Sequence, residues 1–152
     1  NNSCSRRDLF RHWDSEIALH EHRMLVSPSL RDGVSFDRLV RRSIFCLVPD
    51  GHWPATMRLP AVVALECVPV VISNRLEPPF NDLIDWPVAS VWLPEGEIRR
   101  LPYLLSNIKP ETILSMRGHL VELAQALDYH HTRLHILLLA SLAARRPPQA
   151  LT

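Results

Sequence analysis

The sequence predicts an α/β fold built on a parallel sheet that is flanked by helices. Three short apolar runs, at residues 44–48, 68–73 and 89–94, have the length of strands, and the first two lack the alternation of a half-exposed strand. The segments around them either can form helices or are loops rich in Pro, Asn and Asp. Strands that alternate with helices in this way are typical of a parallel sheet.

The length of 152 residues suits one domain with a core of its own. Residues 1–35 show no clean periodicity, so we expect a loosely structured lead-in with one helix near Asp14–Leu25. The main domain is expected over residues 36–144, and a frayed tail over residues 145–152.

Helical spacing recurs before the first strand and after the third. Phe36, Leu39 and Val40 share one face of a short helix that leads into the first strand. After the third strand, Pro102 can start a helix whose apolar stripe is formed by Leu101, Leu104, Leu105 and Ile108. A further helix is expected from Pro110 toward Leu142, with Gly118 as its weak point.

Composition and charge exclude several classes of function. The net charge of +1 argues against a protein that binds nucleic acid through bulk electrostatics. The late apolar stretch at Leu134–Ala144 is far shorter than the roughly 20 residues that cross a bilayer.

The three cysteines do not form the pattern of a disulfide framework. Cys46 lies inside the first apolar run, and Cys67 immediately precedes the second. We expect both to be small buried residues. A bridge between adjacent strands stays open as the alternative, in a secretory compartment.

Other residue types that could carry chemistry do not form a known site. His131 and His135 are one helical turn apart, and His20 and His22 lie close in sequence, but neither pair has a third ligand at the spacing of zinc sites. We therefore expect no metal. Trp53, Trp86 and Trp92 could stack on sugars or a base, although core packing is the commoner role of such residues.

The loop at residues 49–60 follows the first predicted strand, where ligands of α/β sheets usually bind. Gly51 permits close backbone approach, Pro54 can begin the next helix, and Arg58 can reach an anion such as a diphosphate. By these features alone, a simple turn and an anion site both remain open.

A longer run of residues adds a resemblance. Exostosin-like glycosyltransferases have a C-terminal half with the approximate pattern S-x-F-C-L-x-P-x-G-D-x-P-S-S-x-R-L-F-D-A, then G-C-I-P-V-I-x-S-D, then L-P-F and D-W or D-Y. This sequence resembles it, without a gap, at Ser43, Phe45, Cys46, Leu47, Pro49, Gly51, Pro54, Arg58, Leu59, Cys67, Pro69, Val70, Ser73, Pro79, Phe80, Asp85 and Trp86. The similarity continues to about Arg117.

The resemblance implies the C-terminal, Rossmann-like half of a GT-B glycosyltransferase. Such proteins are inverting transferases that bind a nucleotide sugar, usually a UDP-sugar, without a tightly bound metal. The chain would supply the donor-binding part. The anchor in the Golgi membrane and the N-terminal acceptor-binding domain would lie outside it. The expected partners are the nucleotide sugar and a glycan acceptor, with no nucleic acid, and a hetero- or homo-oligomer stays open.

Residues carried over by the resemblance define a donor site. Gly51, Pro54, Thr56 and Arg58 would form the loop around the donor diphosphate. Glu95 falls where the family often has a glutamate after the third strand. It could contact the sugar or the ribose, or accept a proton, and it is therefore the candidate catalytic residue.

Four departures from the family pattern are concentrated around the same loop. His52 and Ala61 replace two aspartates, Pro60 replaces a phenylalanine, and Glu66 replaces the glycine before Cys67. We expect Pro60 to kink the helix at a cost of ~3 kcal/mol, and Glu66 to stand where a positive φ favours glycine. These changes predict reduced or absent transferase activity. The alternative function is therefore a catalytically impaired domain that acts as an interaction or scaffolding subunit.

Overall fold

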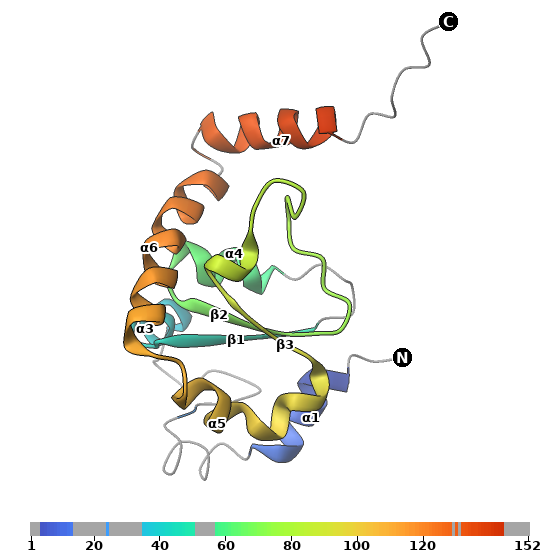
Figure 1. Ribbon diagram of the computed structural model, residues 1–152, viewed down its shortest axis with the longest axis vertical. Helices are drawn as coiled ribbons and strands as arrows, with labels where there is room; N and C mark the ends of the chain where they lie inside the picture. Colours follow the sequence, from blue (N-terminus) through green and yellow to red (C-terminus); the bar gives the residue numbers. More distant parts are fainter. Residues whose placement is uncertain are drawn as a thin grey trace, which may run out of the picture.

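The computed structural model describes residues 4–13, 24, 35–50, 57–128, 130 and 132–144 of the chain. At its centre lies a three-stranded sheet formed by β1 (Phe45–Pro49), β2 (Val68–Ile72) and β3 (Val91–Leu93), in the order β1-β2-β3 (Figure 1). Both neighbouring pairs are parallel, as the sequence predicts.

The register of the sheet explains why its middle strand is the most apolar. Phe45 of β1 lies opposite Val68 of β2, and Val70 of β2 lies opposite Val91 of β3. All five residues of β2 are buried, whereas the three residues of β3 are only partly buried. A strand covered on both faces and on both edges has no position for a polar side chain, which accounts for the continuous apolar run.

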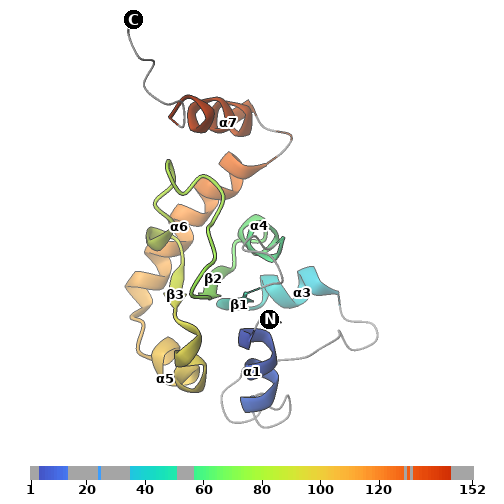
Figure 2. The same cartoon turned by 90° about the vertical axis from the view of Figure 1, so that its right-hand side faces the viewer.

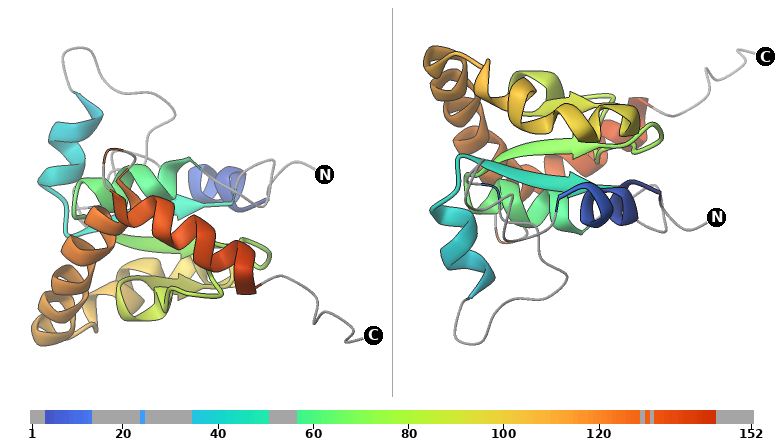
Figure 3. Two further views of the ribbon diagram at one scale, coloured as in Figure 1. Left: turned by 90° about the horizontal axis from the view of Figure 1, so that it is seen from above. Right: turned by 90° about the horizontal axis from the view of Figure 1, so that it is seen from below.

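Helices cover both faces of the sheet, giving three layers (Figures 2 and 3). One face carries α4 (Arg58–Ala64) and α6 (Pro110–Leu127), with α3 (Phe36–Arg41) and the 3₁₀ turn η1 (Trp86–Val88) at its margins. The other face carries α1 (Cys4–His12), the 3₁₀ helix η2 (Glu95–Arg100) and α5 (Leu101–Ser106). The helix α7 (Thr132–Ala144) lies beyond α6.

The apolar core is divided by the sheet into two parts. The larger part lies between the sheet and the helices α4 and α6, and includes Val48, Val63 and Leu120. The smaller part lies toward α1 and η2, and includes Leu9, Ile72 and Ile98. Burial of these side chains is the main stabilising contribution to the fold.

The N-terminal helix α1 was not anticipated, because its residues were assigned to a loose lead-in. Leu9 is only 3% exposed, and Trp13 donates a hydrogen bond from Nε1 to the carbonyl oxygen of Ile98 at 2.9 Å. These contacts make α1 part of the core. The helix predicted near Asp14–Leu25 lies outside the described residues apart from Met24, and the tail at residues 145–152 lies outside them entirely.

The single long helix predicted from Pro110 toward Leu142 is wrong, because α6 ends at Leu127 and α7 begins at Thr132. Asp128 is extended, and its Oδ1 accepts a hydrogen bond from the backbone N–H of His130 at 3.0 Å. This local side-chain bond competes with continuation of the helix. Gly118, predicted as the weak point, lies within α6 without interrupting it.

The predicted kink at Pro60 is also wrong, because α4 begins at Arg58 and the proline occupies its third position. The first backbone N–H to bond within the helix is that of Ala61, which donates to the carbonyl oxygen of Met57. An N–H at position 60 would have no partner within the helix, so proline removes no hydrogen bond there.

The prediction of positive φ at Glu66 is confirmed, since its φ is 57°. The residue follows the end of α4 and precedes Cys67, where the chain turns into β2. A side chain in this left-handed region is strained by contact of Cβ with the backbone. Phe80 also has a positive φ, of 55°.

The expectation of two separate buried cysteines is wrong in one respect. Both residues are buried, as predicted, but Cys46 and Cys67 form a disulfide. Because β1 and β2 are neighbours in the sheet, the two Cα atoms lie 5.9 Å apart, within the usual range for a bridge. The alternative of a bridge between adjacent strands is the correct one.

Candidate functional site

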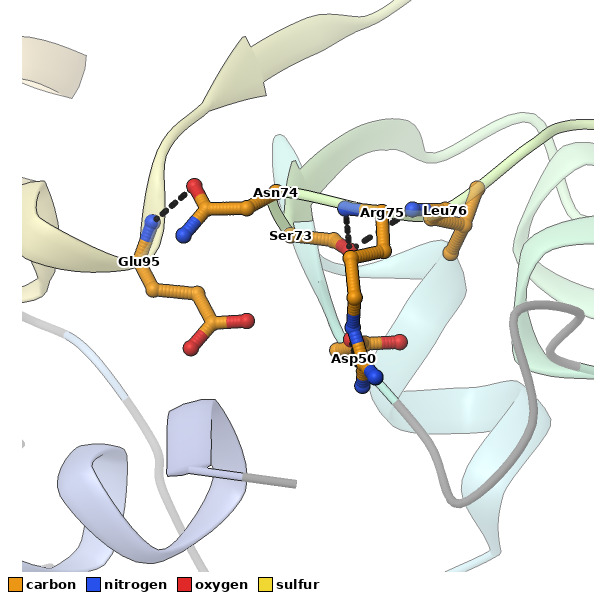
Figure 4. Close-up of polar contacts among 6 residues, drawn as sticks. All are labelled: Asp50, Ser73, Asn74, Arg75, Leu76 and Glu95. Carbon is orange, nitrogen blue, oxygen red and sulfur yellow. Dashed lines mark hydrogen bonds and ion pairs between the residues drawn. The ribbon is translucent and has the colours of Figure 1, made fainter. Parts of the chain in front are cut away.

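The carboxyl ends of the three strands meet at one edge of the sheet. Asp50 follows β1, Ser73 follows β2, and Glu95 comes two residues after β3 (Figure 4). In open α/β sheets this edge is where ligands bind, because the loops that leave the strands present polar groups there. We therefore take these loop ends as the candidate site.

Only part of the predicted donor site lies within the described residues. Gly51, Pro54 and Thr56 are outside them, as is the departing residue His52. Arg58 and Glu95 are described, and they follow β1 and β3 respectively.

Arg58 is the first residue of α4, where the chain returns from that loop. Arg58 is exposed in part, but partial desolvation of its guanidinium lowers the pKa of Arg58, and the charge of Arg6 on α1 lowers it further. An arginine still stays protonated at neutral pH. An anion bound beside Arg58 would counter both effects, since it replaces lost solvation and neutralises the like charge. The unanticipated helix α1 thus brings a second cation toward the site.

Glu95 begins η2 and is partly buried. Its backbone N–H donates a hydrogen bond to Oδ1 of Asn74 at 3.3 Å, which links the loop after β3 to the loop after β2. In Figure 4 its carboxylate points toward the side on which Arg75 meets Asp50. This places a carboxylate at the same edge of the sheet as Arg75.

An ion pair between a buried carboxylate and an exposed arginine links the loops after β1 and β2. Nη2 of Arg75 lies 3.0 Å from Oδ2 of Asp50 (Figure 4). The side chain of Asp50 is 0% exposed, whereas that of Arg75 is 62% exposed. A carboxylate taken fully out of water is stable only with partners of this kind.

The loop after β2 is held by its own first residue. Oγ of Ser73 accepts hydrogen bonds from the backbone N–H groups of Arg75 and Leu76, at 2.9 and 2.8 Å. A serine side chain that takes two successive N–H groups fixes the turn that follows it. The backbone from which Arg75 projects is therefore ordered by local bonds.

Trp86 and Trp92, for which the sequence favours core packing over stacking on a ligand, both pack against the apolar core. Trp86 is 2% exposed and donates from Nε1 to the carbonyl oxygen of Pro79. Trp92 is partly buried and donates from Nε1 to Oγ of Ser90. Both also line a hollow of about 560 Å³ beside the loop at residues 78–87. Its described lining contains neither Arg58 nor Glu95, and Trp53 lies outside the described residues.

Asp50, Asn74 and Arg75 were missed by the sequence reasoning. A signal for them was present, because each follows an apolar run that was correctly predicted to be a strand. Polar residues in that position gather at the carboxyl edge of a parallel sheet. The pairing of Asp50 with Arg75 needs the order of the strands, which the sequence did not establish.

Within the part of the chain that the structure describes, no three His, Cys, Asp or Glu residues come together as ligands for a metal ion. His20, His22 and His131 lie outside that part. None of the described helices combines the length and the apolar character that a bilayer span requires.

Comparison with known proteins identifies relatives over most of the chain. The family model described as the exostosin GT47 domain matches residues 1–108. A probable glycosyltransferase of Arabidopsis thaliana is 33% identical over 71% of this chain and 22% of its own length. Exostosin-1 of Drosophila melanogaster is 31% identical over 70% of this chain and 14% of its own length. A probable glucuronosyltransferase of Oryza sativa subsp. japonica is 35% identical over 55% of this chain and 20% of its own length.

Proposed function

Because the chain belongs to the exostosin GT47 family, we propose that it is the donor-binding part of a glycosyltransferase. It binds a nucleotide sugar, a UDP-sugar by the resemblance, whose sugar is transferred to a glycan acceptor. The chain spans about a quarter or less of the length of the relatives it matches, so the acceptor-binding part belongs to the remainder of such a protein.

One observation carries this proposal: the position of Arg58. It follows the first strand at the carboxyl edge of a parallel sheet, and the charge of Arg6 reaches it from α1. Phosphate oxygens satisfy guanidinium groups through charge-assisted, often paired hydrogen bonds. We infer that Arg58 contacts the donor diphosphate beside a loop formed by Gly51, Pro54 and Thr56.

Glu95 is the candidate for contact with the sugar or the ribose. It lies after β3, and its backbone is tied to Asn74. Hydroxyl groups donate well to a carboxylate. As the alternative role, Glu95 accepts a proton, which requires it to come within hydrogen-bond reach of the acceptor hydroxyl.

The wider assignment follows from the resemblance. We propose a GT-B architecture in which this three-layer unit is the Rossmann-like donor half, an inverting reaction, no tightly bound metal and residence in the Golgi membrane. The Cys46–Cys67 disulfide supports the last point in a general way, because disulfides persist in oxidising compartments such as those of the secretory route.

A second candidate function is a catalytically impaired domain that serves as an interaction or scaffolding subunit. The observation that favours it is the place of two residues that differ from the family pattern. Ala61 lies in α4 where the family pattern has an aspartate, and Glu66 adopts a backbone conformation suited to glycine. Loss of an acidic group near the donor loop would remove a contact to ribose or a catalytic carboxylate.

Titration calorimetry with UDP tests the two candidates. We expect the 152-residue chain to bind UDP, and Arg58→Ala to weaken binding by at least about tenfold, the scale of one charge-assisted hydrogen bond. Arg38→Ala is the matched control. Arg38 is an exposed arginine on α3, which leads into the amino end of β1 and so lies away from the carboxyl edge of the sheet. A folded chain that does not bind UDP would contradict the proposal of a donor-binding glycosyltransferase domain and favour the scaffolding subunit.

A further inference from the structure

Arg75 is held at the candidate site by an ion pair with the fully buried carboxylate of Asp50. Its Nη2 bonds to Oδ2 of Asp50, and the carboxylate of Asp50 is fully buried directly before the loop at residues 51–56. The side chain of Arg75 remains 62% exposed. One end of this guanidinium is thus anchored to the interior, while the rest of the side chain faces outward.

The anchoring leaves donors available. A guanidinium carries five N–H donors in a planar fork. Among the residues that the structure describes, Asp50 is the side chain to which Arg75 donates, through one Nη2 contact. The guanidinium is planar, so its remaining donors lie in one plane with Nη2. A guanidinium already held at one donor loses less conformational entropy when it binds a second oxyanion than a free one does.

The backbone beneath Arg75 is fixed as well. Ser73 holds the N–H of Arg75, and Asn74 holds the N–H of Glu95 (Figure 4). The loops after all three strands are thereby joined: β1 to β2 through Asp50 and Arg75, and β2 to β3 through Asn74 and Glu95. These bonds hold the three loop ends in one arrangement in the absence of a ligand.

We propose that Arg75 binds the diphosphate of the donor, and that Asp50 is the positioning residue that orients it. This inference rests on the proposed donor site and adds a second arginine to it. Arg58 begins α4, after residues 51–56 in the sequence, and Arg75 contacts Asp50, the residue before them. The ligand class is a nucleoside diphosphate or its sugar ester.

The test compares UDP with uridine, which lacks the diphosphate. We expect Arg75→Gln to weaken UDP binding at least about tenfold while the affinity for uridine stays unchanged. Arg75→Lys should restore part of the UDP affinity, because it keeps the charge but not the planar fork. Asp50→Asn, which keeps the shape of the side chain, should weaken UDP binding less than Arg75→Gln does. Arg38→Gln removes the same charge from α3 and should leave both affinities unchanged.

The outcomes separate the two proposals. If the wild-type chain binds UDP and Arg58→Ala weakens binding, but Arg75→Gln does not, then Arg75 is not a ligand and only this inference is overturned. If Arg75→Gln weakens UDP and uridine equally, or Arg75→Lys rescues nothing, the residue acts through the fold and the inference is again overturned. If the folded wild-type chain binds no UDP, the donor site itself is wrong.

Discussion

Cys46, the second residue of β1, forms a disulfide with Cys67, the residue that precedes β2. The bridge spans 21 positions of sequence, and the enclosed segment contains the loop at residues 51–56 and all of α4. The bridge lies at the amino ends of β1 and β2, the edge of the sheet opposite to the carboxyl edge that carries the candidate site.

Removal of this bond should destabilise the domain. Closing a loop of this length lowers the entropy of the unfolded chain, so the double variant Cys46→Ala with Cys67→Ala should lose about 3 kcal/mol of unfolding free energy. Urea denaturation with and without reductant measures it. Reductant should weaken the wild-type protein and leave the double variant unchanged. Equal sensitivity of both proteins to reductant would contradict the bridge.

Glu66 carries strain that glycine would relieve. Its φ is 57°, so Glu66→Gly should raise the unfolding free energy by about 1 kcal/mol. The matched control is Ala64→Gly at the last position of α4, which should destabilise by a similar amount because glycine is unfavourable in a helix. Thermal or urea unfolding distinguishes these opposite signs. A loss of stability in Glu66→Gly would show that the carboxylate makes a contact worth more than the strain.

Pro60 should be nearly neutral despite its place in a helix. Because it lies before the first N–H that bonds within α4, Pro60→Ala should change the unfolding free energy by less than about 1 kcal/mol. Ala61→Pro removes the N–H that bonds to Met57 and should cost about 1 to 3 kcal/mol. Urea denaturation of the two variants checks the boundary of the helix. A large gain of stability in Pro60→Ala would restore the view that this proline interrupts α4.

Ser141 connects α7 to the loop after β2. Its Oγ donates to Oδ2 of Asp82 at 2.9 Å, and Ser141 is only 6% exposed. Ser141→Ala should cost about 1 to 2 kcal/mol through loss of a hydrogen bond to a charged acceptor. The readout is proteolysis between α6 and α7, which should become faster. Ser115→Ala, at an exposed position of α6, is the control and should leave the rate unchanged.

The residues around the site show how far sequence reasoning reached. The resemblance led to the family, which the match over residues 1–108 confirms, and it selected Arg58 and Glu95. The roles of these two residues stay predictions, as do those of Gly51, Pro54 and Thr56. Asp50 and Arg75 were not selected, because an ion pair across 25 positions leaves no periodic signal in the chain.

The sequence by itself determined the features that depend on near neighbours. Continuous apolar runs identified the three described strands, helical spacing and two prolines indicated the starts of α3, α5 and α6, and the family resemblance pointed to a positive φ at Glu66. The tertiary structure decided the features that depend on distant ones: the Cys46–Cys67 bridge, the contact of α1 with the core and the pairing of Asp50 with Arg75. The physical reason is that strand order and register bring such residues together, whereas local periodicity reports only which face each residue occupies.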